Sequence, residues 1–272
     1  MQRHCPSVAS SSTYVYFRHE PASRGLPVGE RVLLIGVYGM ELVECGGALA
    51  ANAAAGGESH AALMLCSERM QRDVAQAAQI LDVQLQFLNF RNGYVNVDED
   101  HKRALVRVIR AIRPSIVVTQ DPEHSLADLD PDRRPAMTLI LEALGLASRA
   151  FALDDGLAPH PVPTVYYMTP SRPNCVVNIA PHWDKKVAAM DALEAQLEFS
   201  GQHWSDAMKP EDLEALVPGY AELGSDVERG RAMHRALDRA VHIYHGIGHH
   251  GRFAFAEAYR REGDFHLQTL SA

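Results

Sequence analysis

The sequence predicts an α/β fold built on one Rossmann-like, mainly parallel sheet with helices on both faces. Two observations support this prediction. Short, almost continuously apolar runs rich in Val, Ile and Leu alternate with longer segments whose apolar residues recur at helical spacing. Such runs are typical of parallel strands that helices bury on both faces. Right-handed connections then place the loops that follow the strands at one edge of the sheet.

Between residues 31 and 150, strands and helices are expected to alternate. Strands are predicted at residues 31–35, 60–66, 84–89 and 115–119. Helices are predicted at residues 47–55, 69–81, 101–112 and 135–147. Gly56-Gly57 ends the first helix and Pro114 follows the third, because neither residue type continues a helix readily.

The second half of the chain has a different pattern. Residues 163–169 and 175–179 are expected to be two strands that form a smaller extension of the sheet. Helices are predicted at residues 185–202, at 226–243 and around 253–261.

A chain of 272 residues is long enough for one large α/β domain or two small ones. A single domain is expected over residues 31–262. Residues 1–30 are polar and interrupted by Pro and Gly, which predicts an N-terminal arm with a short strand at 14–17. Residues 263–272 are expected to form a C-terminal tail.

Composition argues against several classes of protein. The net charge of −8 disfavours a nucleic-acid-binding face, which needs a basic patch. No apolar run approaches the roughly 20 residues of a membrane span, and the first residues lack the apolar core of a secretion signal. The four cysteines lie far apart, as is typical of reduced thiols rather than of a disulfide framework. We expect a cytoplasmic protein without nucleic-acid or membrane partners.

The loop that follows the strand 115–119 is rich in carboxylates. It carries Asp121, Glu123, His124, Asp128, Asp130 and Asp132, and Glu41 and Glu44 lie in the loop expected to face it. Oxygen-rich clusters suit Mg²⁺, Ca²⁺ or Mn²⁺, so a relocated metal site is one interpretation. The alternative is a solvated loop in which Asp121 and Asp128 cap turns or pair with Arg133 and Arg134.

The loop after the first strand resembles a motif of a known family. Residues 36–41 read Gly-Val-Tyr-Gly-Met-Glu, and Gly46-Gly47 follows at the start of a helix. This frame is similar to A-H-P-D-D-E-x-x-x-x-G-G of the LmbE/PIG-L-like de-N-acetylases, zinc hydrolases that remove acyl groups from amino sugars such as GlcNAc. In that comparison the metal-binding His corresponds to Val37, the base Asp to Gly39 and the ligand Asp to Met40.

The carboxylate-rich loop resembles the T-x-D-P and D-x-H-P-D-H-R segments of the same family. Thr119, Asp121-Pro122, Asp128, Pro131-Asp132 and Arg134 keep that framework. The two histidines correspond to Asp130 and Arg133, and the second of them is the family's third zinc ligand. Weaker similarities elsewhere, such as Ala256-Glu-Ala-Tyr-Arg260 for A-E-A-F-R, extend the resemblance over about residues 31–262 and imply the family's fold.

The resemblance implies a zinc-dependent C–N hydrolase that assembles as a homo-oligomer, but the matching positions lack that chemistry. Val37 has no donor atom, and an arginine at position 133 is cationic without a free lone pair. Met40 offers a soft thioether that Zn²⁺ rarely takes, and Gly39 has no side chain to act as a base. We therefore predict a degenerate zinc site, with no metal ligands and no zinc cofactor.

Three hypotheses for function follow. The first is a pseudoenzyme that binds a polar, sugar-like small molecule, or that partners an active relative; its ligand-binding residues would be Tyr38, Gly39, Met40, Asp128, Arg133 and Arg134. In this case an ion pair of Arg133 with Glu41 or Asp130 fills the former metal position.

The second hypothesis is a remodelled enzyme acting on an N-acyl amino sugar, an amide or an ester; its catalytic carboxylates would be Glu41, Asp121 and Asp130. The third is an active deacetylase with ligands from unexpected positions, such as His124 with Glu41 or Asp128.

Overall fold

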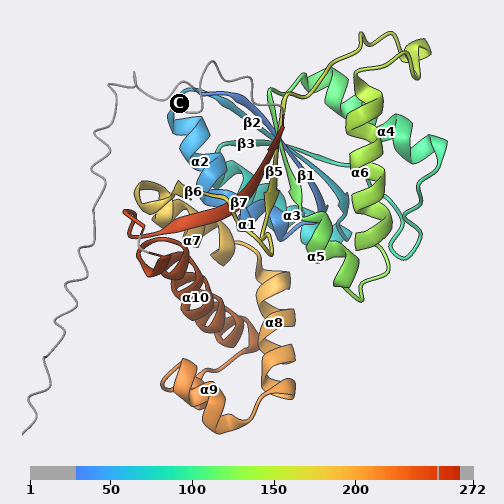
Figure 1. Cartoon of the computed structure of the whole chain (residues 1–272). Helices are drawn as coiled ribbons and strands as arrows, with labels where there is room; N and C mark the ends of the chain where they lie inside the picture. The colour runs from blue at the N-terminus through green and yellow to red at the C-terminus, as the bar shows by residue number, and fades with distance from the viewer. Residues whose placement is uncertain (1–28, 250, 264–272) are drawn as a thin grey trace, which may run out of the picture.

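In a computed structural model, which describes residues 29–249 and 251–263, seven strands form one sheet in the order β3-β2-β1-β4-β5-β7-β6 (Figure 1). They are β1 (Arg31–Tyr38), β2 (Glu58–Leu65), β3 (Val83–Phe87), β4 (Ile116–Gln120), β5 (Thr164–Met168), β6 (Cys175–Asn178) and β7 (Ala256–Gly263). Neighbouring strands from β3 to β5 are parallel, whereas β7 is antiparallel to both β5 and β6. The predicted fold class is confirmed.

Helices cover both faces of this sheet (Figure 1). They are α1 (Glu41–Glu44), α2 (Gly46–Ala54), α3 (Glu68–Leu81), α4 (Glu99–Ile112), α5 (Pro122–Ala127), α6 (Arg133–Ala147), α7 (Trp183–Asp191), α8 (Glu194–Ala207), α9 (Pro210–Leu216) and α10 (Asp226–His245). Side chains of β1 alternate between the faces: Val32 and Leu34 pack with α2, α3 and α7. Leu33, Ile35 and Val37 pack with α4 and α6 on the other face.

The strand order creates a crevice where β1 and β4 end. The connection after β1 leads to β2 on one side, and the connection after β4 leads to β5 on the other. Open α/β sheets bind ligands at such a point, because the loops diverge there and leave a gap. Thr119 Oγ1 donates to the carbonyl oxygen of Ile35 at 2.9 Å, which ties the two strands together just below the crevice.

Helices α8, α9 and α10 extend away from the sheet (Figure 1). Glycines let α8 and α10 approach closely: a Cβ at Gly201 would lie 1.9 Å from the carbonyl oxygen of Asp226, and a Cβ at Gly230 would lie 1.9 Å from that of Leu197. This contact fixes α10 beside α7 and β7. Among the described residues, no helix is both long enough and apolar enough to cross a membrane.

Every strand and helix predicted between residues 31 and 150 is present, with ends shifted by a few residues. The helix predicted around residues 253–261 is wrong, because this segment is strand β7. Its backbone fills the space between β5 and β6 and pairs with both, so the tertiary structure overrides a weak helical pattern. The strand expected at 14–17 and most of the predicted arm and tail lie outside the described residues.

Two further predictions need correction. The single helix expected at 185–202 is two helices, α7 and α8, which meet at the buried Leu193. Asp73 on α3 accepts a hydrogen bond from the backbone N–H of Ala195 at 2.9 Å, so a residue distant in sequence supports the new helix start. The carboxylate-rich loop contains a short helix, α5, whose N-cap is Asp121.

Candidate functional site

The loop after β1 turns Glu41 back toward its own strand. Glu41 begins α1, and its Oε2 accepts a hydrogen bond from the backbone N–H of Val37 at 2.8 Å. Its side chain is almost fully buried, and burial raises its pKa to about 7 although Arg133 opposes the rise. Glu41 therefore depends on a cationic neighbour to carry its charge.

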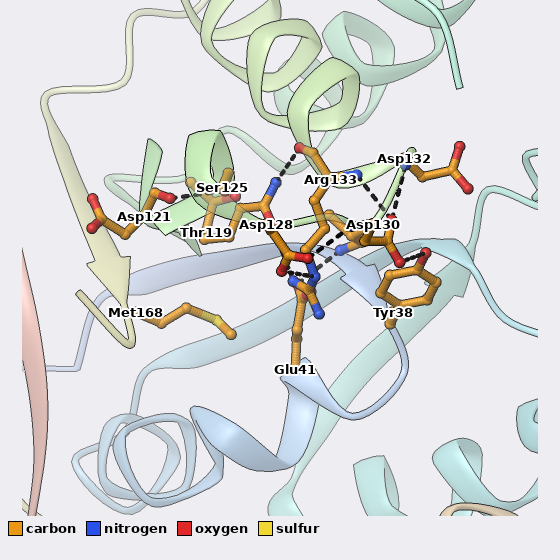
Figure 2. Close-up of polar contacts among 12 residues, drawn as sticks. Tyr38, Glu41, Thr119, Asp121, Ser125, Asp128, Asp130, Asp132, Arg133 and Met168 are labelled. Atoms are coloured by element: carbon orange, nitrogen blue, oxygen red, sulfur yellow. Dashed lines mark hydrogen bonds and ion pairs between the residues drawn. The ribbon is translucent and has the colours of Figure 1, made fainter. Parts of the chain in front are cut away.

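That neighbour is Arg133, the first residue of α6. Its Nη1 lies 3.0 Å from Glu41 Oε1 and 3.2 Å from Gln120 Oε1, and its Nε lies 3.2 Å from Asp128 Oδ2 (Figure 2). The ion pair between Glu41 and Arg133 that the sequence suggested is confirmed. It connects the two loops across the crevice at the ends of β1 and β4.

Asp130 and Tyr38 form a second link between the same loops. The Tyr38 hydroxyl donates to Asp130 Oδ2 at 2.7 Å (Figure 2). Asp130 Oδ1 also accepts from the backbone N–H groups of Asp132, at 2.8 Å, and Arg133, at 3.2 Å. Burial and the Asp130 contact raise the pKa of Tyr38 well above its ordinary value. Both carboxylate oxygens of Asp130 are thus used in shaping the loop.

Asp121 stands apart from this group, to the left in Figure 2. It is fully buried, and its Oδ1 accepts from Arg260 Nη2 at 2.7 Å while its Oδ2 accepts from the Ser171 backbone N–H at 3.2 Å. Burial alone would raise the pKa of Asp121, but these hydrogen bonds outweigh it and hold the pKa below its usual range. Arg260 pairs with Asp121 and with Glu262.

The other predicted ligand-binding residues differ in their surroundings. Gly39 is buried, and a Cβ placed on it would lie 2.7 Å from Val74 Cγ2. Arg134 is exposed and contacts only the backbone of this group, donating to the carbonyl oxygen of Asp128. Met40 lines a cavity together with Val43 and Glu44 of α1. The structure therefore brings together Tyr38, Glu41, Asp128, Asp130 and Arg133, but not Asp121, Gly39, Met40 or Arg134.

The cavity beside Met40 has a volume of about 230 Å³. Its walls come from α1, the end of β5, α7, α10 and β7. Four charged side chains line it: Glu44, Lys186, Asp238 and Glu257. None of the three carboxylates expected to be catalytic belongs to its lining. This cavity could not be predicted from the sequence, because its residues come from five elements that only the packed structure brings together.

Lys186 and Glu257 neutralise each other at the base of this cavity. Lys186 Nζ lies 2.9 Å from Glu257 Oε1 and also donates to the carbonyl oxygens of Val43 and Glu44. An ammonium group has three donors, so none remains for a ligand. Glu257 in turn accepts from the backbone N–H groups of Gly47 and Ala48, each at 2.8 Å, at the start of α2. This pair is structural.

A metal centre needs several His, Cys, Asp or Glu side chains close together, and the described part of the chain is residues 29–249 and 251–263. In that part of the chain, no three His, Cys, Asp or Glu side chains lie grouped so that they could hold a metal ion. The five carboxylates of the 121–132 segment are instead directed into caps, turns and ion pairs with arginine.

Comparison with known proteins places this geometry in a wider group. A family model described as PIG-L: GlcNAc-PI de-N-acetylase matches residues 41–143, which include Glu41, the 121–132 segment and Arg133. No curated protein matches the chain.

Several solved structures share the fold. N,N'-diacetylchitobiose deacetylase from Pyrococcus horikoshii is 18% identical with a TM-score of 0.64, over 85% of this chain and 83% of that one. A 4-carboxy-2-hydroxymuconate hydratase from Pseudomonas putida is 19% identical with a TM-score of 0.62, over 88% and 99%. The conserved protein TT1542 from Thermus thermophilus is 20% identical with a TM-score of 0.64, over 89% and 100%. Similarity at this level of identity shows a shared fold and leaves the reaction open.

Proposed function

Because this chain belongs to the PIG-L/LmbE de-N-acetylase family, we propose that it is a diverged member that binds a polar, sugar-like small molecule without zinc-dependent hydrolysis. The observation that carries this proposal is the ion pair between Arg133 and Glu41, with 3.0 Å between Nη1 and Oε1. It places a guanidinium where the resemblance puts a zinc-binding histidine, and a guanidinium both lacks a lone pair and repels a cation.

The other two positions of the family's metal site also fit zinc poorly. Val37 is fully buried in the core beside α6 and offers no donor atom. Met40 offers only a thioether, which is a soft ligand. A hydrolytic zinc ion needs three protein ligands from nitrogen, oxygen or thiolate and an open position for water. None of the three family positions supplies such a ligand.

The position of the family's catalytic base is closed by packing. A Cβ on Gly39 would lie 2.7 Å from Val74 Cγ2 and 3.4 Å from Cys66 Sγ. Val74 is itself fully buried, so it has little freedom to move away. This contact supports the proposal, because the space that a base would occupy is filled by the core.

A remodelled enzyme is the second candidate, and the contacts of its carboxylates weigh against it. Glu41 is bound to Arg133, Asp121 to Arg260, and Asp130 to Tyr38. A general acid or base needs a free oxygen within reach of a substrate. These side chains are instead committed to holding loops in place, and they do not share the cavity beside Met40.

That cavity is the proposed ligand site. Its volume of about 230 Å³ lies below the range of pockets for drug-sized ligands, roughly 300–1,000 Å³. It therefore suits a molecule of about monosaccharide size. A relative of the same fold is a deacetylase of N,N'-diacetylchitobiose, which supports a sugar-like ligand.

Metal content tests the first half of the proposal. The purified, tag-free protein is analysed for zinc before and after incubation with excess zinc and dialysis, and acetate release from N-acetylglucosamine and N,N'-diacetylchitobiose is measured. We expect zinc far below one per chain and no zinc-dependent acetate release. About one zinc per chain, retained by the wild type and lost in Glu41→Gln, would overturn the proposal.

Ligand binding tests the second half. Leu237 lines the cavity mouth and is 49% exposed, so Leu237→Trp is expected to obstruct the cavity without disturbing the core. Leu216→Trp on α9, where Leu216 is 53% exposed, is the matched control. Sugar binding measured by calorimetry should fall at least tenfold in the first variant and stay unchanged in the second. Binding that survives Leu237→Trp would place the ligand elsewhere.

Self-association, or pairing with an active relative, remains a prediction that light scattering tests.

A further inference from the structure

We propose that the cavity beneath α10 recognises a free, positively charged amino group, so that the ligand is a small polar molecule carrying a primary amine. This inference rests on the proposed function and names the chemical class of its ligand. The walls of the cavity carry more negatively than positively charged side chains.

Among the described residues, the cavity lining has three carboxylates and one ammonium group, together with His234, His242 and His245. Glu257 and Lys186 form a closed pair, as their hydrogen bonds show. The carboxylates of Glu44 and Asp238 take part in no hydrogen bond or ion pair with a described residue, although both side chains are only partly exposed. Two carboxylates therefore line this space with no direct hydrogen bond or ion pair to a described residue, and only more distant cations oppose their charge.

The titration behaviour of the two groups agrees with this geometry. Burial is the largest cause that raises the pKa of Glu44, and repulsion from Asp238 adds to it while Arg133, Lys186 and His124 oppose it. Burial likewise raises the pKa of Asp238, with Glu257 adding and Lys186 opposing. A bound ammonium group would relieve both effects, because it supplies the missing opposite charge.

An independent observation comes from His234 on α10, which also lines the cavity. Its side chain is 3% exposed, and its Nε2 lies 3.0 Å from Ser200 Oγ on α8. Its Nδ1 is buried and has no hydrogen-bond partner among the residues that the structure describes. Burial lowers the pKa of His234 to about 4, so the ring is neutral near pH 7. An unpartnered buried nitrogen here indicates a ligand that brings a hydroxyl or amino group of its own.

Other ligand classes fit less well. An anion would meet the unpaired Glu44 and Asp238 and be repelled. A divalent metal needs several ligands in a fixed arrangement, and within the described residues no cluster has the grouping of a metal site. A primary amine needs no fixed coordination geometry and carries a single charge. The apolar side of the cavity, which includes Met40, Met168 and Met190, suits the carbon skeleton of such a molecule.

Calorimetry on the full chain tests the inference with glucosamine, N-acetylglucosamine and glucose, which differ in the charge of one substituent. Wild-type protein should bind glucosamine at least tenfold more tightly than the two neutral sugars. Glu44→Gln and Asp238→Asn keep the shape of each side chain and should each reduce this preference to below threefold. Glu211→Gln, which removes an exposed carboxylate on α9, is the matched control and should leave the preference unchanged.

Thermal stability separates ligand recognition from a structural role. Glu44→Gln and Asp238→Asn should have a melting temperature equal to or above that of the wild type, because each removes an uncompensated charge. A fall in melting temperature would show that the carboxylates support the fold and would overturn the inference.

Failure of this inference differs from failure of the proposed function. Equal binding of all three sugars by wild type and variants would leave a sugar-binding protein and overturn the amine preference alone. Zinc-dependent release of acetate would overturn the proposed function instead. If neither glucosamine, galactosamine nor ethanolamine binds, the amine site is ruled out.

Discussion

Arg133 and Glu41 join two loops that lie 92 positions apart in the sequence, with 3.0 Å between guanidinium Nη1 and carboxylate Oε1. Glu41 is almost fully buried, whereas Arg133 is partly exposed and reaches it from the start of α6. The pair stands where strands β1 and β4 end, at the point where a ligand would be expected to bind in this fold. A cation supplied by the chain thus stabilises the edge of the sheet.

Loss of Arg133 should destabilise the protein strongly. Arg133→Met leaves Glu41 as a buried charge without its partner, which costs on the order of 3 kcal/mol. The double variant Glu41→Gln, Arg133→Met should recover most of that loss, because no charge then remains buried. Urea denaturation of the wild type, both single variants and the double variant measures this coupling. Simple additivity of the two single effects would contradict the account of the pair.

A side chain at position 39 should be poorly tolerated. In Gly39→Ala the new Cβ would lie 2.7 Å from Val74 Cγ2, and overpacking of this kind costs about 1–3 kcal/mol. Val74→Ala removes the clashing methyl groups, so the double variant should be more stable than the sum of the single effects predicts. Chemical denaturation gives the three free energies of unfolding. A neutral Gly39→Ala would show that this position is open after all.

Glu257 should be among the most sensitive residues on β7. It pairs with the buried Lys186 and accepts two backbone hydrogen bonds at the start of α2 and one from the Tyr259 hydroxyl. Glu257→Ala leaves an unpaired buried ammonium and should cost about 3–5 kcal/mol. Glu262→Ala on the same strand, where the side chain is 47% exposed, is the control and should stay within about 0.5 kcal/mol of the wild type. Equal effects of the two substitutions would contradict this ranking.

The buried His234 should cause the free energy of unfolding to fall in mild acid. Burial lowers its pKa in the folded state to about 4, below its ordinary value of 6.5. The unfolded chain therefore binds more protons than the folded protein between pH 4 and pH 6.5. The contribution of His234 to the free energy of unfolding is complete above about pH 6.5 and declines as the pH falls toward 4. The loss amounts to about 3 kcal/mol. In His234→Gln the difference in unfolding free energy between pH 7 and pH 4 should shrink by about that amount. An unchanged difference would show that His234 is not held neutral.

Strands and helices whose pattern reflects burial could be predicted from the sequence alone. The strands β1, β2 and β4 contain continuous apolar runs because helices cover both faces, the strand β3 alternates apolar residues with Gln, and the intervening helices have an apolar stripe. The strand β7 could not be predicted, because eight residues with several charges become a strand only when β5 and β6 offer backbone partners. The break between α7 and α8 depends in the same way on Asp73, far away in the sequence.

The candidate site also could be predicted from the sequence only in part. The chain order of its motifs, together with right-handed connections, was enough to predict that Glu41 and Arg133 face each other. The sequence did not reveal that Asp121 is drawn away by Arg260, which lies 139 positions later. Nor did it reveal the cavity, because Glu44, Lys186, Asp238 and Glu257 come from four different elements.

The sequence by itself determined the α/β fold and the two facing loops, and it carries the substitutions at positions 37, 40 and 133 on which the proposal of a zinc-free site rests. It could do so because local patterns of apolar residues and short motifs are properties of neighbouring positions. Only the tertiary structure decided which charges found partners and which did not. Whether a carboxylate is neutralised depends on the burial and position of side chains from distant elements, and these are set when the chain packs.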